Sequence, residues 1–121
     1  MRKVLKGFVY AFNGLAYAVR TQVNFQIHLI SALAAIVLGF YFQISKTEWM
    51  WICLCIGLVL IFELLNTALE AFVDLVSPEY NVKAGIVKDV AAAAVLVTAI
   101  LSVAIGLFIF LPRFAELWDL R

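Results

Sequence analysis

The run from Trp49 to Phe62 contains no charged residue, and it constrains the fold more than any other stretch of the chain. A run this apolar is typical of a membrane span, which needs about 20 mostly apolar residues. The chain as a whole is 66% apolar and has a mean hydropathy of +1.07, whereas soluble domains are about 45–50% apolar. The sequence therefore predicts an integral membrane protein. Its net charge of +1 does not indicate a nucleic-acid-binding surface, and we expect no nucleic-acid partner.

Three segments are predicted to span the membrane as α-helices, at about residues 25–43, 49–73 and 90–111. The predicted fold is an all-α membrane protein. Residues 1–121 are expected to form a single domain, because this length suits one small domain.

The polar segments between the spans are predicted to be loops, at residues 45–48 and 79–89. Pro78 and Pro112 are expected to end the second and third spans, because proline cannot donate a backbone hydrogen bond. His28, near the inner end of the first span, is interpreted as an interface residue rather than a ligand.

Residues 2–21 are predicted to form an amphipathic helix that lies on the membrane surface. Apolar and polar residues recur at helical spacing on opposite faces of this segment. The polar stripe offers cations to anionic lipid or to phosphate, and it consists of Lys3, Lys6, Tyr10, Asn13, Tyr17 and Arg20. Two interpretations remain open: the helix only anchors the protein, or its polar stripe also forms a wall of a nucleotide site.

The basic residues are divided unevenly between the two sides of the predicted membrane. By the positive-inside rule, the richer side is cytoplasmic. The N-terminal side carries Arg2, Lys3, Lys6, Arg20, Lys83 and Lys88, and the other side carries Lys46, Arg113 and Arg121. The sequence thus predicts a multi-pass protein of the cell membrane, with its N-terminus in the cytoplasm and its C-terminus outside.

The second span carries three acids and an amide on one face, near its predicted cytoplasmic end. At about 100° per residue, Glu63, Glu70 and Asp74 fall within about 40° of one another, and Asn66 lies about 60° to the side. Ionisable side chains at membrane depth are expensive and usually mark a functional site. Three carboxylates this close in a low-dielectric setting are relieved by a bound cation or by a proton kept on one of them. Because one subunit cannot easily bury this face, an oligomeric helix bundle is expected.

These residues could together phosphorylate a lipid alcohol. Mg²⁺ takes oxygen ligands from one or two carboxylates and from substrate phosphates, which suits Glu70 and Asp74. Glu63, the deepest of the acids, could act as a general base toward a hydroxyl. Lys88, just before the third span, could neutralise phosphate.

The spacing alone does not select this chemistry. The sequence has no phosphate-binding Gly-rich loop of the nucleotide triphosphatase type and no soluble kinase signature. One alternative is a small oligomeric ion or proton conduit that uses the acids, and another is a structural subunit whose acids pair with a partner's cations.

The string Glu63-Leu-Leu-Asn-Thr-Ala-Leu-Glu70, followed by Asp74 and by residues 84–96, resembles the small prokaryotic diacylglycerol kinase family. The resemblance covers nearly the whole chain, and Asn24-Phe25 and Phe110-Leu111-Pro112 resemble its Gram-positive branch, whose members act mainly as undecaprenol kinases. It implies ATP- and Mg²⁺-dependent phosphorylation of undecaprenol, or alternatively of diacylglycerol, by direct phosphoryl transfer at the cytoplasmic interface. It also implies a homotrimer of three-span subunits with active sites shared between subunits.

The resemblance implies a role for each residue that matches the family's motifs. Glu63 matches the catalytic base and, with Asn24, contacts the lipid substrate, while Asn66 matches an active-site polar residue. Glu70 matches a divalent-metal ligand that also serves the nucleotide. The other nucleotide contacts that it implies are Lys3, Tyr10, Glu79, Tyr80, Asn81, Lys88 and Asp89.

One position departs from the family pattern. Where the family has a glutamate that is a metal ligand, this chain has Gln22, either a natural variant or an engineered substitution. Glutamine keeps the shape and one carbonyl oxygen of glutamate but loses its negative charge. We expect Gln22 to ligate a metal only weakly, which affects a second metal and the rate but not the fold.

Overall fold

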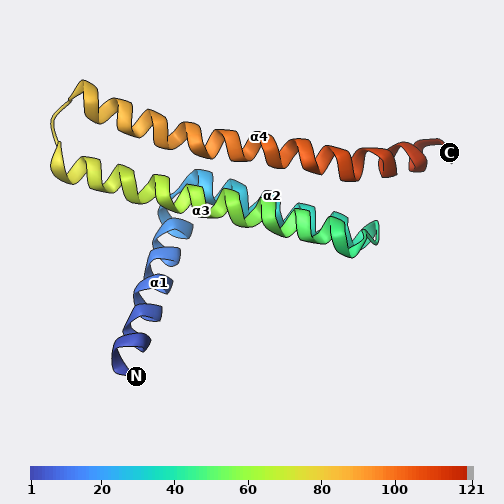
Figure 1. Ribbon diagram of the computed structural model, residues 1–121, viewed down its shortest axis with the longest axis horizontal. Helices are drawn as coiled ribbons and strands as arrows, with labels where there is room; N and C mark the ends of the chain where they lie inside the picture. Colours follow the sequence, from blue (N-terminus) through green and yellow to red (C-terminus); the bar gives the residue numbers. More distant parts are fainter. Residues whose placement is uncertain (120–121) are drawn as a thin grey trace.

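The computed structural model describes residues 1–119, and over these residues the chain forms four α-helices. Three helices lie side by side as a bundle, and the N-terminal helix leaves this bundle at a steep angle (Figure 1). The helices are α1 (Arg2–Thr21), α2 (Val23–Tyr41), α3 (Lys46–Val76) and α4 (Val82–Asp119). The prediction of an all-α protein with an N-terminal helix followed by three apolar helices long enough to span a membrane is confirmed. Arg121, one of the basic residues counted above, lies outside the described residues.

The three long helices are suited to crossing a membrane by their length and composition. α2 has 19 residues and rises about 28 Å, which is close to the roughly 30 Å thickness of the hydrocarbon core. α3 has 31 residues and α4 has 38, so both are longer than this core requires. The chain is therefore a multi-pass membrane protein with three candidate spans.

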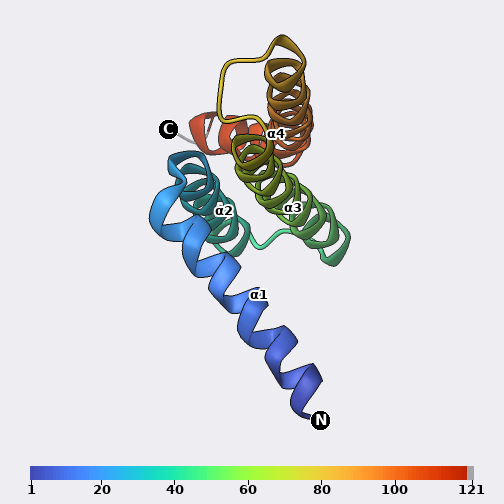
Figure 2. The same ribbon diagram turned by 90° about the vertical axis from the view of Figure 1, so that its left-hand side faces the viewer.

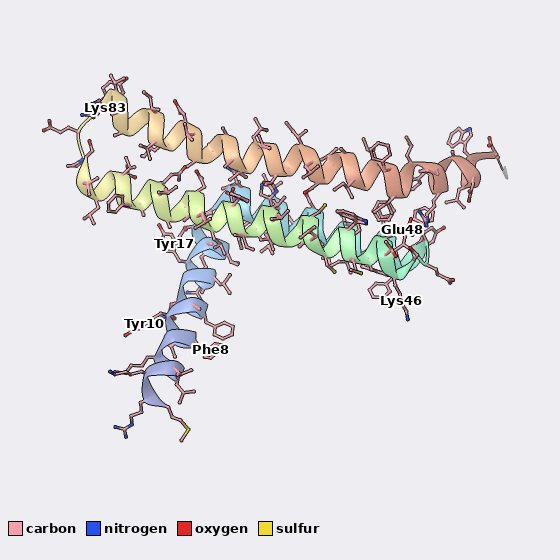
Figure 3. The ribbon with its side chains drawn as sticks, viewed as in Figure 1. Phe8, Tyr10, Tyr17, Lys46, Glu48 and Lys83 are labelled. Carbon is pink, nitrogen blue, oxygen red and sulfur yellow. The ribbon has the colours of Figure 1, made fainter. Side chains whose placement is uncertain are left out.

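α3 lies between α2 and α4 and packs against both (Figure 2). The α2–α3 turn closes one end of the bundle, here called the distal end, and the α3–α4 loop closes the proximal end. Figure 3 shows Glu48 at the distal end and Lys83 at the proximal end. At the proximal end α3 and α4 continue past the start of α2, so this part of the bundle contains only these two helices (Figure 1).

An apolar cluster fills the distal end. Gly39 lets α2 approach α3 closely, because a Cβ at this position would lie 2.7 Å from Cη2 of Trp49. The ring of Phe42 lies 4.9 Å from the ring of Phe114 on α4, in an edge-on arrangement. We call this cluster the distal core, and its buried members are Ile44, Ile52, Ile109 and Phe110.

The prediction that Pro112 ends the third span is wrong, because α4 continues through this residue to Asp119. Proline removes one backbone donor, so the Phe108 carbonyl oxygen loses its usual helical partner. The adjoining turn is held to α3 by the Arg113 guanidinium, which donates to the Ile109 carbonyl oxygen at 2.5 Å and to Glu48 Oε2 at 2.9 Å. Beyond the proline, the last turns of α4 turn aside from the axis of the helix (Figure 2).

The first predicted loop is shorter than expected, because its polar residues begin a helix. Ser45 and Glu48 form a capping box at the start of α3. Ser45 Oγ accepts a hydrogen bond from Glu48 N at 3.3 Å, and Glu48 Oε2 accepts one from Ser45 N at 2.8 Å.

The second predicted loop is also shorter, for the same reason. α3 ends before Pro78 as predicted. α4, however, already begins at Val82, where Asn81 Oδ1 accepts a hydrogen bond from Lys83 N at 2.9 Å. Lys88 and Asp89 therefore lie on α4 and not in a loop.

Candidate active site

All buried polar side chains of the described residues belong to one short stretch of α3. They are Glu63, which is 2% exposed, Asn66, which is 7% exposed, and Thr67, which is 8% exposed. Polar groups removed from water destabilise a protein unless they find partners, so such a concentration calls for a reason. The sequence predicted the first two of these residues as a site, and the structure places them one turn apart inside the bundle.

Asn66 holds one free acceptor in this stretch. Its Nδ2 donates to Glu70 Oε1 at 3.2 Å, which joins the amide to the next acid along the face. Its Oδ1 is buried and has no hydrogen-bond partner. A buried carbonyl oxygen without a donor costs about 1–3 kcal/mol. The position therefore suits a ligand that brings a proton donor or a cation.

Glu63 is surrounded by helices rather than by cations. Thr67 Oγ1 donates to the backbone oxygen of Glu63 at 2.9 Å, and this bond does not involve the carboxylate. A carboxylate in this position can accept a proton or a hydrogen bond from a molecule that enters the site.

Asp74 and Lys88 bring α3 and α4 together nearer the proximal end. Lys88 Nζ donates to Asp74 Oδ1 in an ion pair, in which the side chains are 37% and 67% exposed, respectively. Exposed ion pairs contribute only about 0–1 kcal/mol, so the ammonium group can exchange this partner for a phosphate at little cost. The neighbouring Asp89 is exposed at the same level of α4.

Other predicted nucleotide contacts are not brought to this site within one chain. The N-terminal half of α1, which carries Lys3 and Tyr10, lies away from the bundle (Figure 3). Glu79 and Tyr80 are exposed in the α3–α4 loop, and Asn81 of the same loop caps α4.

The C-terminal half of α1 does approach the site. It meets α3 across a hollow of 560 Å³, whose lining includes Gly14, Tyr17 and Ala18 of α1 and Thr67 of α3. Small residues on both helices keep this contact close, and one member of the polar stripe, Tyr17, takes part in it. The C-terminal half of α1 therefore lies beside Thr67 of the buried polar stretch, and the role of the polar stripe in a nucleotide site stays a prediction.

Gln22 forms the junction between α1 and α2. It is the single non-helical residue between them, with φ −104° and ψ 105°, and its Nε2 donates to Thr21 Oγ1 at 3.0 Å. Asn24 lies exposed in the first turn of α2. In the described part of the chain, no three His, Cys, Asp or Glu side chains lie close enough to form a metal centre by themselves.

His28, interpreted from the sequence as an interface residue, is half-buried and lines the groove between α2, α3 and α4. Its depth in a membrane stays a prediction.

Comparison with known proteins supports the resemblance. The family model described as "Prokaryotic diacylglycerol kinase" matches residues 9–110. The undecaprenol kinase of Bacillus subtilis (strain 168) is 44% identical over 113 residues, which cover 93% of this chain and 92% of that protein. A diacylglycerol kinase of Synechocystis sp. is 42% identical over 94% of this chain and 66% of its own length. The diacylglycerol kinase of Escherichia coli (strain K12) is 31% identical over 84% of this chain and 83% of its own length.

Proposed function

The chain belongs to the prokaryotic diacylglycerol kinase family and is a membrane lipid kinase, and from this premise we propose that its preferred substrate is undecaprenol, with diacylglycerol as the alternative. The kinase family implies ATP as the phosphoryl donor. The choice of undecaprenol is supported by the similarity to the Bacillus subtilis protein, which extends over nearly the full length of both chains. It is also supported by the lower identity to the Escherichia coli diacylglycerol kinase.

The observation that carries the proposed mechanism is the buried polar stretch of α3. Glu63 orients the lipid hydroxyl or takes its proton, and the hydroxyl oxygen attacks the γ-phosphorus of ATP in line. The bond from this phosphorus to the β–γ bridging oxygen breaks, and ADP leaves. Asn66 lies one turn nearer the proximal end and keeps Oδ1 free for the incoming groups. Burial of Glu63 among helices excludes water, so the lipid alcohol and not water meets the base.

The residues present fit a magnesium ion. The carboxylate of Glu70 and the free Oδ1 of Asn66 are neighbouring oxygen donors, and Mg²⁺ favours one or two such ligands plus phosphate oxygens. Glu70 would hold the ion, and Gln22 would contribute at most a neutral carbonyl oxygen. When bound, the ion neutralises charge that develops on the phosphate oxygens.

We place the nucleotide toward the proximal end. Lys88 releases Asp74 and pairs with the phosphates, and Asp89 and the loop residues Glu79, Tyr80 and Asn81 contact the rest of the nucleotide. This arrangement is supported by the weak, exposed ion pair that holds Lys88.

Lys3 and Tyr10 can join the same site only from another subunit, because the N-terminal half of α1 leads away from the acids of its own chain. This separation supports an oligomer with shared active sites, and the number of three subunits comes from the family resemblance alone. The excess of basic residues at the N-terminal side supports a cytoplasmic N-terminus and site, with the C-terminus outside the cell membrane.

The decisive experiment compares Glu63→Gln with the unchanged protein in detergent, using radiolabelled ATP and either undecaprenol or diacylglycerol. Loss of a general base lowers the rate by about 10²- to 10⁴-fold. Glu116→Gln, in the exposed last turns of α4, is the matched control and keeps full activity. Retained turnover by Glu63→Gln would remove this residue from the base role. A higher kcat/KM for diacylglycerol would overturn the choice of undecaprenol.

A further inference from the structure

The junction between α1 and α2 is packed tightly on both sides of Gln22. Ala18, one turn before it, is 1% exposed, and Phe25, three residues after it, is 2% exposed. Ala18 also lines the hollow in which α1 meets Thr67 of α3. Because no further residue separates the two helices, the bonds that cross Gln22 determine how α1 is placed against the rest of the chain.

A side-chain hydrogen bond crosses this junction from α2 to α1. Gln26 Nε2 donates to the Val19 backbone oxygen at 2.8 Å. Val19 belongs to the last turn of α1, where the carbonyl groups have no partner further along the helix. The preceding carbonyl, that of Ala18, accepts from the backbone N–H of Gln22 at 2.9 Å. Gln26 therefore caps the end of α1 from the neighbouring helix and joins the two helices directly.

The amide of Gln22 is oriented by two bonds at the end of α1. Thr21 Oγ1 donates to the Tyr17 backbone oxygen at 2.8 Å, and this bond uses the only proton of the hydroxyl. Toward Gln22 the hydroxyl can therefore only accept, and it accepts from Gln22 Nε2 at 3.0 Å. The carbonyl oxygen of this amide, Oε1, is left as the atom that can meet a cation. Its direction depends on where the last turn of α1 lies.

Packing alone does not explain a glutamine at position 26. This residue lies in the second turn of α2, an apolar helix, and its side chain is exposed rather than buried. A polar amide on an apolar span is costly unless it has a hydrogen-bond partner. The partner of Gln26 is on α1, so the amide connects the two helices.

We propose that Gln26 is a positioning residue for phosphoryl transfer, an inference that rests on the proposed function. Its bond to the Val19 carbonyl fixes the angle between α1 and α2. This angle holds the C-terminal half of α1 beside Thr67 and keeps Gln22 Oε1 available to the magnesium ion. Gln26 contacts no substrate itself and acts through α1. Loss of its bond widens the range of angles that α1 adopts and weakens the binding of Mg²⁺.

Two substitutions of Gln26 separate its hydrogen bond from the space that its side chain fills. Gln26→Met keeps the length of the side chain but removes the donor, whereas Gln26→Lys keeps a donor. Gln26→Met is expected to raise the Mg²⁺ concentration that gives half the maximal rate by about 2- to 10-fold, the factor that corresponds to one hydrogen bond. Gln26→Lys is expected to stay within about twofold of the unchanged protein, because its ammonium group can donate to the same carbonyl at the C-terminal end of α1.

Ser31→Ala is the matched control. Ser31 Oγ donates to the Ile27 backbone oxygen at 2.9 Å within α2, so this bond does not cross to α1. The substitution is expected to leave the half-saturating Mg²⁺ concentration unchanged. If Gln26→Met lowers Tm and kcat together at an unchanged Mg²⁺ requirement, Gln26 is merely structural and the proposal is refuted. It is also refuted if Gln26→Lys needs as much Mg²⁺ as Gln26→Met.

The placement of α1 can be measured without turnover as the distance between two spin labels on the full-length protein in detergent. One label is attached to the exposed Cys53 of α3 and the other to α1 through Lys6→Cys, with the buried Cys55 replaced by alanine. Labelled subunits are diluted into an excess of unlabelled protein, so that each distance is measured within one chain. Gln26→Met is expected to broaden the distance distribution, and Gln26→Lys is expected to keep it narrow. Equal widths in all three forms would overturn the proposal.

Failure of the positioning role and failure of the proposed function give different results. If Gln26 does not position α1, undecaprenol is still phosphorylated, but neither the Mg²⁺ requirement nor the width of the distance distribution follows residue 26. If the proposed function is wrong, no phosphate reaches undecaprenol, whereas the spin labels, which need no ATP, still report whether Gln26 fixes the angle of α1.

Discussion

Replacing Asn66 by leucine is expected to separate the stability of this protein from its activity. The side chain has two polar groups, and in the absence of ligands they contribute to the free energy of unfolding with opposite signs. Its Nδ2 donates to Glu70 Oε1 at 3.2 Å, whereas its Oδ1 is buried without a partner. Leucine is similar in shape and removes both ends at once.

The two contributions to stability nearly cancel. A hydrogen bond to a charged group contributes about 1.5–3 kcal/mol, and a buried acceptor without a donor costs about 1–3 kcal/mol. The net change in the free energy of unfolding is therefore expected to lie within about 1 kcal/mol, which corresponds to a shift in Tm of about 5 °C or less for a chain of this size. The effects of the substitution on activity do not cancel in this way. If Oδ1 contacts the metal or the reacting groups, its loss costs about 1–3 kcal/mol, or about 5- to 150-fold in kcat/KM.

The assay measures Tm in detergent and kcat/KM for undecaprenol on the same preparation. Thr67→Val is the matched control, because Thr67 is equally buried but its hydroxyl bonds only to the Glu63 backbone oxygen. It is expected to change both quantities little. A fall in Tm of more than about 10 °C for Asn66→Leu, with activity lost in proportion, would show that Asn66 is structural. Full activity would show that its free oxygen serves no reacting group.

Three further outcomes are expected. Gln22→Glu should raise both the activity and the affinity for Mg²⁺, because a carboxylate replaces a neutral amide. Titration of Mg²⁺ in the kinase assay measures both effects, and equal kinetics of the two forms would show that position 22 is not a ligand. Gly39→Ala should lower stability by about 1–3 kcal/mol in thermal melts, because its Cβ would lie 2.7 Å from Trp49; an unchanged Tm would mean that the indole moves aside without cost. Arg113→Met should lower Tm, because it removes the bonds to Glu48 and to the Ile109 carbonyl oxygen, and it should leave kcat/KM unchanged. A loss of activity at normal Tm would contradict a purely structural role.

The spans and the acidic face could be predicted from the sequence because both depend on patterns along one helix. Runs without charge indicated where the chain crosses the membrane, and the helical period placed Glu63, Asn66 and Glu70 on one side of α3. The structure keeps this arrangement, with Asn66 bonded to Glu70 one turn further on.

The errors arose where a residue's contacts lie elsewhere in the fold. Ser45 and Asn81 have the polarity of loop residues, but their side chains cap helices, so the helices begin earlier than their apolar runs. A proline usually ends a helix, but α4 continues through Pro112, and the side chain of Arg113 ties the adjoining turn to Glu48 on α3. The residues that neighbour Arg113 in the sequence do not indicate a partner this far along the chain.

Distances between helices also could not be predicted from the sequence. The position of His28 in the groove beside α3 depends on how α2 packs against α3. The separation of Tyr10 from the acids depends on the angle at which α1 leaves the bundle (Figure 3).

The one-residue junction at Gln22 has a mechanical consequence. A linker of several flexible residues would let α1 tilt independently, but a single extended residue passes any rotation of α1 directly into the first turn of α2. With α1 on the membrane surface, as the sequence predicts, we expect bending or thinning of that leaflet to swing the carboxamide at position 22 relative to α3. The curvature of the bilayer would then act on the geometry around the proposed phosphoryl-transfer residues.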